Sequence, residues 1–183
     1  MYIVSTLAGQ VDQDAKLKRA FKRIKDEINI IIDKARDLSH ELAPPSLKYI
    51  GLVGAVKKMI RLVMTDTRLK ITLTHKNMND VTFGANDIVI YRIAQEALKN
   101  ILKHSQATEV KVRMQYVRGY FILEIRDNGK GFDLQKFNER TGLGVDLMRE
   151  RTKLINGVLD VVSDPRSDTI VRLTVSVAGE KKT

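Results

Sequence analysis

EALKNILKH at residues 96–104 and DNGKGFD at residues 127–133 are the stretches that decide the fold. The first ends an apolar segment from Ile88 to His104, whose spacing predicts a helix capped by Asn86 or Asp87. The second follows an apolar strand and reads as a glycine turn that carries a carboxylate. Each segment alone is more often a solvated helix face or a plain turn, so the interpretation depends on their occurring together.

Short strands and helices surround these two stretches. The predicted strands are Lys70–His75, Glu109–Tyr116, Tyr120–Arg126, Val158–Ser163 and Thr169–Val177, and a further helix runs from Val145 to Ile155. Several neighbouring strands are joined as hairpins rather than through helices. This order predicts an α+β sandwich, a mixed sheet packed on helices that cover one of its faces.

The N-terminal third is helical in pattern. Apolar residues recur at helical spacing from Asp12 to Leu42, Pro44 and Pro45 stop that helix, and a second helix is expected from Leu52 to Thr67. The apolar stripe of the first helix packs either on its own domain or on another copy of the same element.

A change of composition near Arg68 predicts the domain boundary. The expected parts are a helical segment at 1–67, a mixed domain at 68–178 and a short tail at 179–183.

Composition excludes several classes of protein. The 183 residues include no cysteine and only three scattered histidines, which excludes a disulfide framework and makes a zinc site improbable. No stretch has the length of a membrane span and no signal peptide begins the chain, so a cytoplasmic domain is expected. The net charge of +10 suits an anionic ligand, but the basic residues are not interleaved with aromatics and Trp is absent. A direct nucleic-acid partner is therefore not expected.

The helix that ends at His104 carries candidate catalytic residues. Glu96, Asn100, Lys103 and His104 follow one another at spacings that place them along one side of the helix. The Asn100 amide oxygen is a neutral hard ligand that suits Mg²⁺, and Lys103 and His104 can reach phosphate. Glu96 could hold a magnesium-bound water or act as a base.

Two more segments supply candidate nucleotide contacts. After the strand, Asp127 can accept a hydrogen bond from an adenine amino group, while Gly129 and Gly131 let the backbone approach a purine that Phe132 flanks. In TGLGVDLMRERTKLING (141–157), a glycine-bearing run precedes a helix whose free amides can cradle phosphate. That run contributes Thr141, Gly142, Leu143 and Gly144, and Thr169 in the last strand is a further candidate.

Together these segments resemble the nucleotide-binding boxes of the gyrase, Hsp90, histidine kinase and MutL ATPases. Residues 92–114, 123–133 and 142–163 are similar, more narrowly, to the catalytic domain of sensor histidine kinases of the nitrate-sensor and degradative-enzyme-sensor type. Residues 37–60 resemble the second helix of that family's dimerisation hairpin. The resemblance, which covers roughly residues 69–177, implies a Bergerat-type sandwich preceded by a long helix of that hairpin.

The resemblance also implies an activity and partners. ATP and Mg would be the cofactors, with Asn100 as the magnesium ligand, Asp127 as the adenine reader, and Gly129, Gly131 and the glycines before the last helix shaping pocket and lid. The γ-phosphate would pass to a histidine and then to a response-regulator aspartate. The full-length protein would form a homodimer through its N-terminal helices and be either membrane-anchored or soluble.

The sequence departs from the family pattern in two places. Asp168 stands before Thr169 where a glycine is frequent, and the family's phosphorylated histidine is absent. His40 lies just before Pro44 and Pro45, where the resemblance places no acceptor, so we expect ATP binding without self-phosphorylation. The alternatives are an ATP-binding regulatory module and a relative of serine kinases or phosphatases. The polar run from 133 to 140 is expected to form a short mobile lid.

Overall fold

The computed structural model describes Phe21, Ile24 and residues 45–78, 81–133 and 143–176. The chain divides into two compact units, 1–44 and 45–183. In the second unit the elements are α3 (Pro45–Asp66), β1 (Lys70–Lys76), α4 (Asn86–Asn100), the π-helix η1 (Ile101–Ser105), β2 (Glu109–Val117), β3 (Tyr120–Asp127), α6 (Leu143–Leu154), β4 (Gly157–Val162) and β5 (Thr169–Ser176). The long helix expected at 12–42 lies outside the described residues, apart from Phe21 and Ile24.

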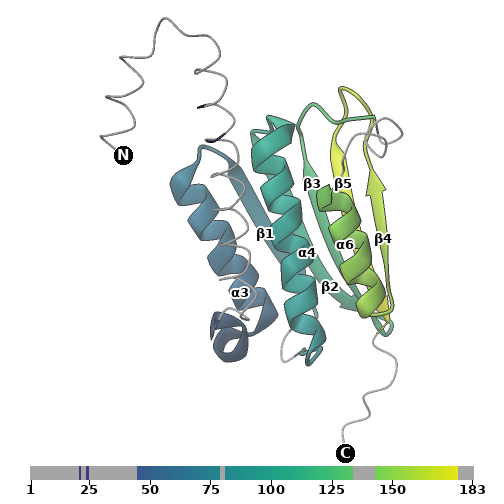
Figure 1. Cartoon of the computed structure of the whole chain (residues 1–183). Helices are drawn as coiled ribbons and strands as arrows, with labels where there is room; N and C mark the ends of the chain where they lie inside the picture. Colours follow the sequence, from purple (N-terminus) through teal and green to yellow (C-terminus); the bar gives the residue numbers. More distant parts are fainter. Residues whose placement is uncertain (1–20, 22–23, 25–44, 79–80, 134–142, 177–183) are drawn as a thin grey trace, which may run out of the picture. The chain divides into compact units, whose positions relative to one another are not determined.

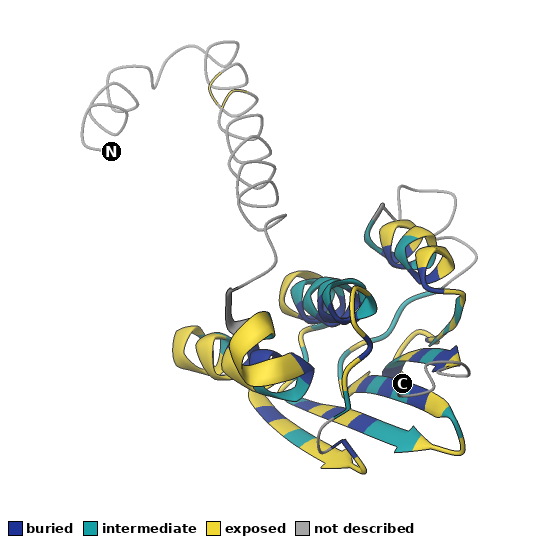
Figure 2. Ribbon diagram, turned by 90° about the horizontal axis from the view of Figure 1, so that it is seen from below, coloured by how far each residue is buried: buried dark blue, intermediate teal, exposed yellow. Residues whose placement is uncertain are grey.

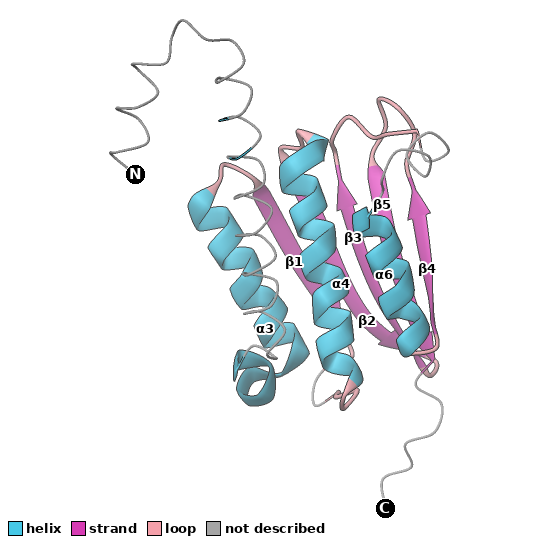
Figure 3. Cartoon of the chain, viewed as in Figure 1, coloured by secondary structure: helices cyan, strands magenta, loops and turns pink. Residues whose placement is uncertain are grey.

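The five strands form one mixed sheet in the order β1-β2-β3-β5-β4. β1 and β2 pair in parallel, and all other neighbours are antiparallel. Helices α3, α4 and α6 lie side by side over one face of this sheet (Figures 1 and 3). The predicted α+β sandwich is therefore confirmed.

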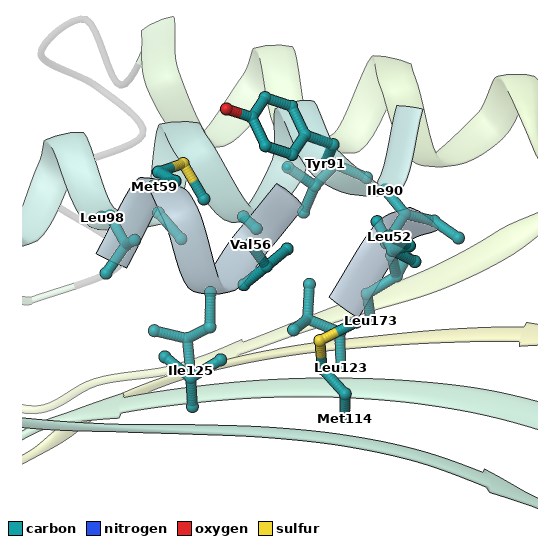
Figure 4. Close-up of a cluster of buried hydrophobic side chains, with 14 of the residues drawn as sticks. Leu52, Val56, Met59, Ile90, Tyr91, Leu98, Met114, Leu123, Ile125 and Leu173 are labelled. Atoms are coloured by element: carbon teal, nitrogen blue, oxygen red, sulfur yellow. The ribbon is translucent and has the colours of Figure 1, made fainter. Parts of the chain in front are cut away.

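The core lies between the sheet and these helices, as the buried bands of Figure 2 show. Inward-facing residues alternate along the strands, and Val110, Met114 and Phe121 are each fully buried. Figure 4 shows Leu123 and Ile125 of β3 pointing toward side chains of the helices. Each such aliphatic or aromatic side chain contributes roughly 1.5–3 kcal/mol through its burial, so this layer holds the helices on the sheet.

The opposite face of the sheet is open and carries a row of charges. Arg113, Glu124 and Arg172 are direct cross-strand neighbours on β2, β3 and β5. Nε and Nη2 of Arg172 donate to Glu124 Oε2 at 3.0 and 2.6 Å, and Arg113 Nη1 lies 3.9 Å from Glu124 Oε1. Opposite charges on facing strands support the pairing and keep this face solvated.

Helix α3 belongs to the second unit. The observed boundary therefore differs from the predicted boundary at Arg68. The helix begins at Pro45 and has a kink at Gly51, where φ is 64° and ψ is 179°. After the kink, Leu52, Val56 and Ile60 enter the same core as the sheet. Because this apolar face completes the sandwich, the compact unit starts with α3, at Pro45. None of the helices in the described part of the chain is long and apolar enough to cross a membrane.

Helix α4 differs from its prediction at both ends. Its N-cap position is Ala85, which makes no side-chain cap. The Asp87 carboxylate instead accepts hydrogen bonds from the Phe83 N–H at 3.2 Å and the Thr82 hydroxyl at 3.0 Å. The α-helical geometry ends at Asn100, and a π-helical turn continues the segment.

Candidate functional site

A cavity of about 230 Å³ lies between α4, η1, α6 and the sheet. Helices supply Ala97, Asn100, Ile101, Lys103, His104, Ser105, Val145 and Met148 to its lining; strands and loops supply Ile125, Asp127, Lys130, Gly131, Phe132, Val161, Thr169 and Val171. The apolar side chains form its walls, and a few polar groups converge on it. This composition is typical of a small-molecule site.

The polar residues of α4 meet the first turn of α6 at this cavity. A Cβ on Gly144 would lie 2.5 Å from Glu96 Oε1 and 2.9 Å from both amide atoms of Asn100. A larger residue at this position would have to displace the ends of these two side chains. The Glu96 carboxylate and the Asn100 amide thus sit next to each other, half-buried, as two oxygen donors.

The π-helical turn carries two basic side chains that line the cavity. Lys103 and His104 both lie in η1, and both line the cavity while remaining exposed. A π turn adds a residue to the helix and re-aims the side chains that follow, which is why such turns are frequent at functional sites. The structure therefore brings Asn100, Lys103 and His104 together, as the spacing predicted.

Asp127 ends β3 beneath the cavity and is only 2% exposed. Its Oδ1 accepts a hydrogen bond from the Gly129 N–H at 2.9 Å. Burial raises the pKa of the Asp127 carboxyl; the bonds from Gly129 and the Ser105 hydroxyl act in the opposite direction, and the Asp168 charge raises the pKa further. A buried carboxylate that faces an apolar cavity is suited to accept a directed hydrogen bond from a ligand.

The loop after Asp127 has no room for larger residues. A Cβ on Gly129 would lie 2.5 Å from the Ser105 carbonyl oxygen, and one on Gly131 would overlap the Asp164 carbonyl oxygen. Gly131 also has a φ of 58°, in the region that favours glycine. Both glycines are thus required by close backbone packing around the cavity.

Phe132 and Thr169 flank the cavity on the sheet side. Thr169 on β5 is the direct cross-strand partner of Asp127. Its hydroxyl lies 2.9 Å from Ser163 Oγ, and this Ser163 oxygen accepts the Phe132 N–H at 3.0 Å. The hydroxyl pair thereby links the loop that carries Phe132 to the strand that carries Thr169.

Some predicted site residues are not placed. His40, Thr141, Gly142 and residues 134–140 of the expected lid lie outside the described residues, as does the side chain of Leu143.

Two polar lining residues, Ser105 and Lys130, were missed by the sequence analysis, as were most of the apolar residues that form the walls. The Lys130 N–H donates to the Ser105 carbonyl at 2.9 Å, so the end of η1 is tied to the glycine loop. No sequence pattern predicts this contact, because the contact depends on the π turn.

Comparisons with known proteins agree with this geometry. Residues 85–179 match the family "Histidine kinase-, DNA gyrase B-, and HSP90-like ATPase". The matched region is more than half of the chain and contains the described cavity. The chain belongs to this family of ATPases.

Within the family, the chain is similar to sensor histidine kinases. It is 35% identical over 173 residues to the oxygen sensor histidine kinase NreB of Staphylococcus carnosus (strain TM300), over 93% of this chain and 49% of that protein. The chain therefore spans about half the length of that relative.

Solved structures share the fold. The Acinetobacter baumannii histidine kinase AdeS matches with a TM-score of 0.60 at 17% identity, over 97% of this chain and 94% of that one. The blue-light activated histidine kinase EL346 of Erythrobacter litoralis matches with a TM-score of 0.59 at 19% identity, over 70% and 41% of the two chains. At these identities the likeness concerns the fold alone.

Proposed function

We propose that this chain is the catalytic part of a two-component sensor histidine kinase, which binds Mg-ATP and transfers the γ-phosphate to a histidine for relay to a response-regulator aspartate. The observation that carries the proposal is the cavity on which the Asn100 amide, Lys103 and His104 of η1 and the buried Asp127 converge. The 35% identity of the chain to a sensor histidine kinase supports this activity over the other activities of the family.

The two ends of the site have different tasks in this proposal. Asp127 accepts a hydrogen bond from the adenine amino group, and the apolar walls around it bury the ring. The cavity is somewhat smaller than the ~300–1,000 Å³ of typical ligand pockets. This volume suits the base, with the phosphates extending past α4 toward Lys103 and His104.

The oxygen donors at the end of α4 fit a magnesium ion. Mg²⁺ prefers oxygen ligands, keeps several waters and shares phosphate oxygens, so one amide and a nearby carboxylate suffice. Asn100 would be the direct ligand, and Glu96 would hold a bound water or act as a base. When bound, the ion would neutralise charge that develops on the transferred phosphoryl group.

Removing the amide should uncouple ATP binding from magnesium. We expect Asn100→Ala to lose most of the affinity that Mg²⁺ adds, because its oxygen is the direct protein ligand. Titration of a fluorescent ATP analogue with Mg²⁺ or with EDTA measures this difference. Gln95→Ala removes an amide from the same helix away from the cavity and should keep the full magnesium effect. An equal magnesium effect in Asn100→Ala would refute the assignment.

Radiolabelled ATP tests the kind of phosphotransfer. Phosphohistidine is acid-labile and phosphoserine is acid-stable, so the label separates this proposal from a serine-kinase alternative. We expect the chain alone to bind ATP without self-labelling and an acceptor histidine to be provided by the longer protein. Acid-labile label that disappears in His40→Gln would instead make His40 the acceptor, and acid-stable label would contradict histidine phosphorylation.

The longer protein is proposed to act as a homodimer through its N-terminal helices and to place this domain in the cytoplasm. The resemblance of residues 37–60 to the second helix of the family's dimerisation hairpin supports this part of the proposal.

A further inference from the structure

An ion pair on the open face of the sheet lies directly behind the cavity. Nε and Nη2 of Arg126 lie 2.7 and 2.6 Å from Asp168 Oδ2, so two donors of one guanidinium meet one carboxylate oxygen. Arg126 immediately precedes Asp127, and Asp168 immediately precedes Thr169. Asp168 is also the residue at which the sequence departs from the frequent glycine.

The ion pair spans the end of the β3–β5 ladder. The register of these strands ends at the pair Asp127 and Thr169, beyond which both chains leave the sheet. Arg126 is opposite Ile170, so its bond to Asp168 crosses diagonally over this last backbone pair. Because side chains alternate along a strand, the bond lies on one face while Asp127 and Thr169 line the cavity on the other.

We propose that Arg126 and Asp168 form a positioning pair that holds the ends of β3 and β5 at the spacing at which Asp127 and Thr169 receive the adenine base. The inference rests on the proposed nucleotide site and assigns a role in base binding to two residues that do not touch the ligand.

The exposure of the pair argues for an effect on binding rather than on overall stability. The side chains of Arg126 and Asp168 are 53% and 37% exposed. Ion pairs with such exposure contribute little to folding. Away from the ends of β3 and β5, the backbone pairing of the five strands already holds the sheet together. The end of the ladder is where an added link changes the local geometry most, because strand pairing stops there.

The charge of the pair also reaches the cavity. Asp168 raises the pKa of Asp127, and in the native pair Arg126 compensates the Asp168 charge. The other charged or titratable groups around Asp127 are Lys103 and His104 of η1, Lys130 of the loop, and Glu109 and Lys111 of β2. None of these is changed by substitutions at the pair.

The test compares single, swapped and control variants. We expect Arg126→Ala and Asp168→Ala each to weaken ATP binding roughly three- to tenfold at neutral pH. The double variant with Arg126→Asp and Asp168→Arg restores an ion pair and should regain most of this affinity. Glu124→Ala and Arg172→Ala remove a similar pair from the same two strands, farther from the end of the ladder, and should leave binding unchanged.

The pH profile provides a readout that simple loosening of the sheet would not give. The ionised Asp127 carboxylate is a stronger acceptor for the amino group than the neutral carboxyl, so binding weakens at acidic pH. Arg126→Ala leaves the Asp168 charge uncompensated and should move this fall to higher pH, whereas Asp168→Ala should move it to lower pH. Calorimetric ATP titrations between pH 4 and 8, on the order of half a pH unit apart, resolve the two directions.

The outcomes separate this inference from the proposed function. Loss of binding in Asp127→Asn, with unchanged affinity and pH profile in the variants at Arg126 and Asp168, overturns the positioning pair alone. A swapped variant no better than the single variants also overturns it. Full ATP binding by Asp127→Asn overturns the nucleotide site itself.

Discussion

Asp127→Asn should lose most of the affinity for ATP. The amide introduced by this substitution could still accept the Gly129 N–H, but it would replace the charged acceptor that faces the cavity. Losing a directed bond to a buried charged group costs on the order of 1–3 kcal/mol, or roughly 5- to 150-fold in affinity. Isothermal titration with Mg-ATP measures the loss. Asp160→Asn removes an exposed carboxylate of β4 and should bind like the unaltered chain.

The same variant should be more stable than the unaltered chain at neutral pH. Burial raises the pKa of Asp127 above its ordinary value of 3.8, so the ionised form is disfavoured in the folded state. The stabilising contribution of the Asp127 carboxyl to the folded state is fully present below pH 3.8 and is lost as the pH rises through the raised pKa. The Asn variant does not undergo this loss. Thermal unfolding should show a higher Tm for the variant at pH 7 and no such advantage near pH 3.

A gain in stability together with a loss of binding would identify Asp127 as a functional rather than a structural residue. Equal ATP affinity in the two proteins, or a lower Tm for Asp127→Asn at pH 7, would contradict this assignment.

Gly131→Ala should destabilise the fold strongly. Gly131 has a φ of 58°, and an added Cβ would overlap the Asp164 carbonyl oxygen and lie 2.5 Å from that of Ser167. Gly84 is a matched control, since its φ is 59° but nothing lies within 4 Å of an added Cβ. Both substitutions carry the cost of left-handed backbone, about 1–2 kcal/mol. Only Gly131→Ala adds a backbone clash, which typically costs a further ~1–3 kcal/mol.

Urea unfolding measures both variants on one scale. We expect Gly131→Ala to have the clearly lower midpoint and to bind ATP weakly, because the loop beneath the cavity must shift. Equal midpoints for the two variants would show that a Cβ at position 131 is accommodated, and would contradict the predicted backbone clash.

The sheet was predictable because its residues alternate. In β2, the buried residues Val110, Val112 and Met114 alternate with the exposed residues Lys111 and Arg113, so the pattern indicates which face is buried. The boundary of the compact unit was not predictable from the sequence, because α3 has the pattern of any amphipathic helix and this pattern does not say what its apolar face packs on. Leu52 and Val56 contact the core of the sheet, and no local pattern distinguishes that partner from another helix.

The candidate site was predictable where residue type and spacing coincide. Residue type makes Asn100 a candidate magnesium ligand and Asp127 a candidate hydrogen-bond acceptor, and the joint occurrence of their segments in this order singles both out. Ser105 and the Arg126–Asp168 ion pair were missed, because their contacts arise from the π turn and from strand register. Such contacts join residues that are far apart in sequence, and composition carries no signal for them.

Amide chemical shifts recorded during a titration with Mg-ATP test the central claim, that ATP occupies this cavity. The expected result is that the shifted resonances belong to Ala97, Ser105, Gly129 and Thr169, which lie at or next to the cavity, while those of Arg113 on the open sheet face stay in place. Shifts concentrated on the open face, with the cavity residues unmoved, would contradict the claim.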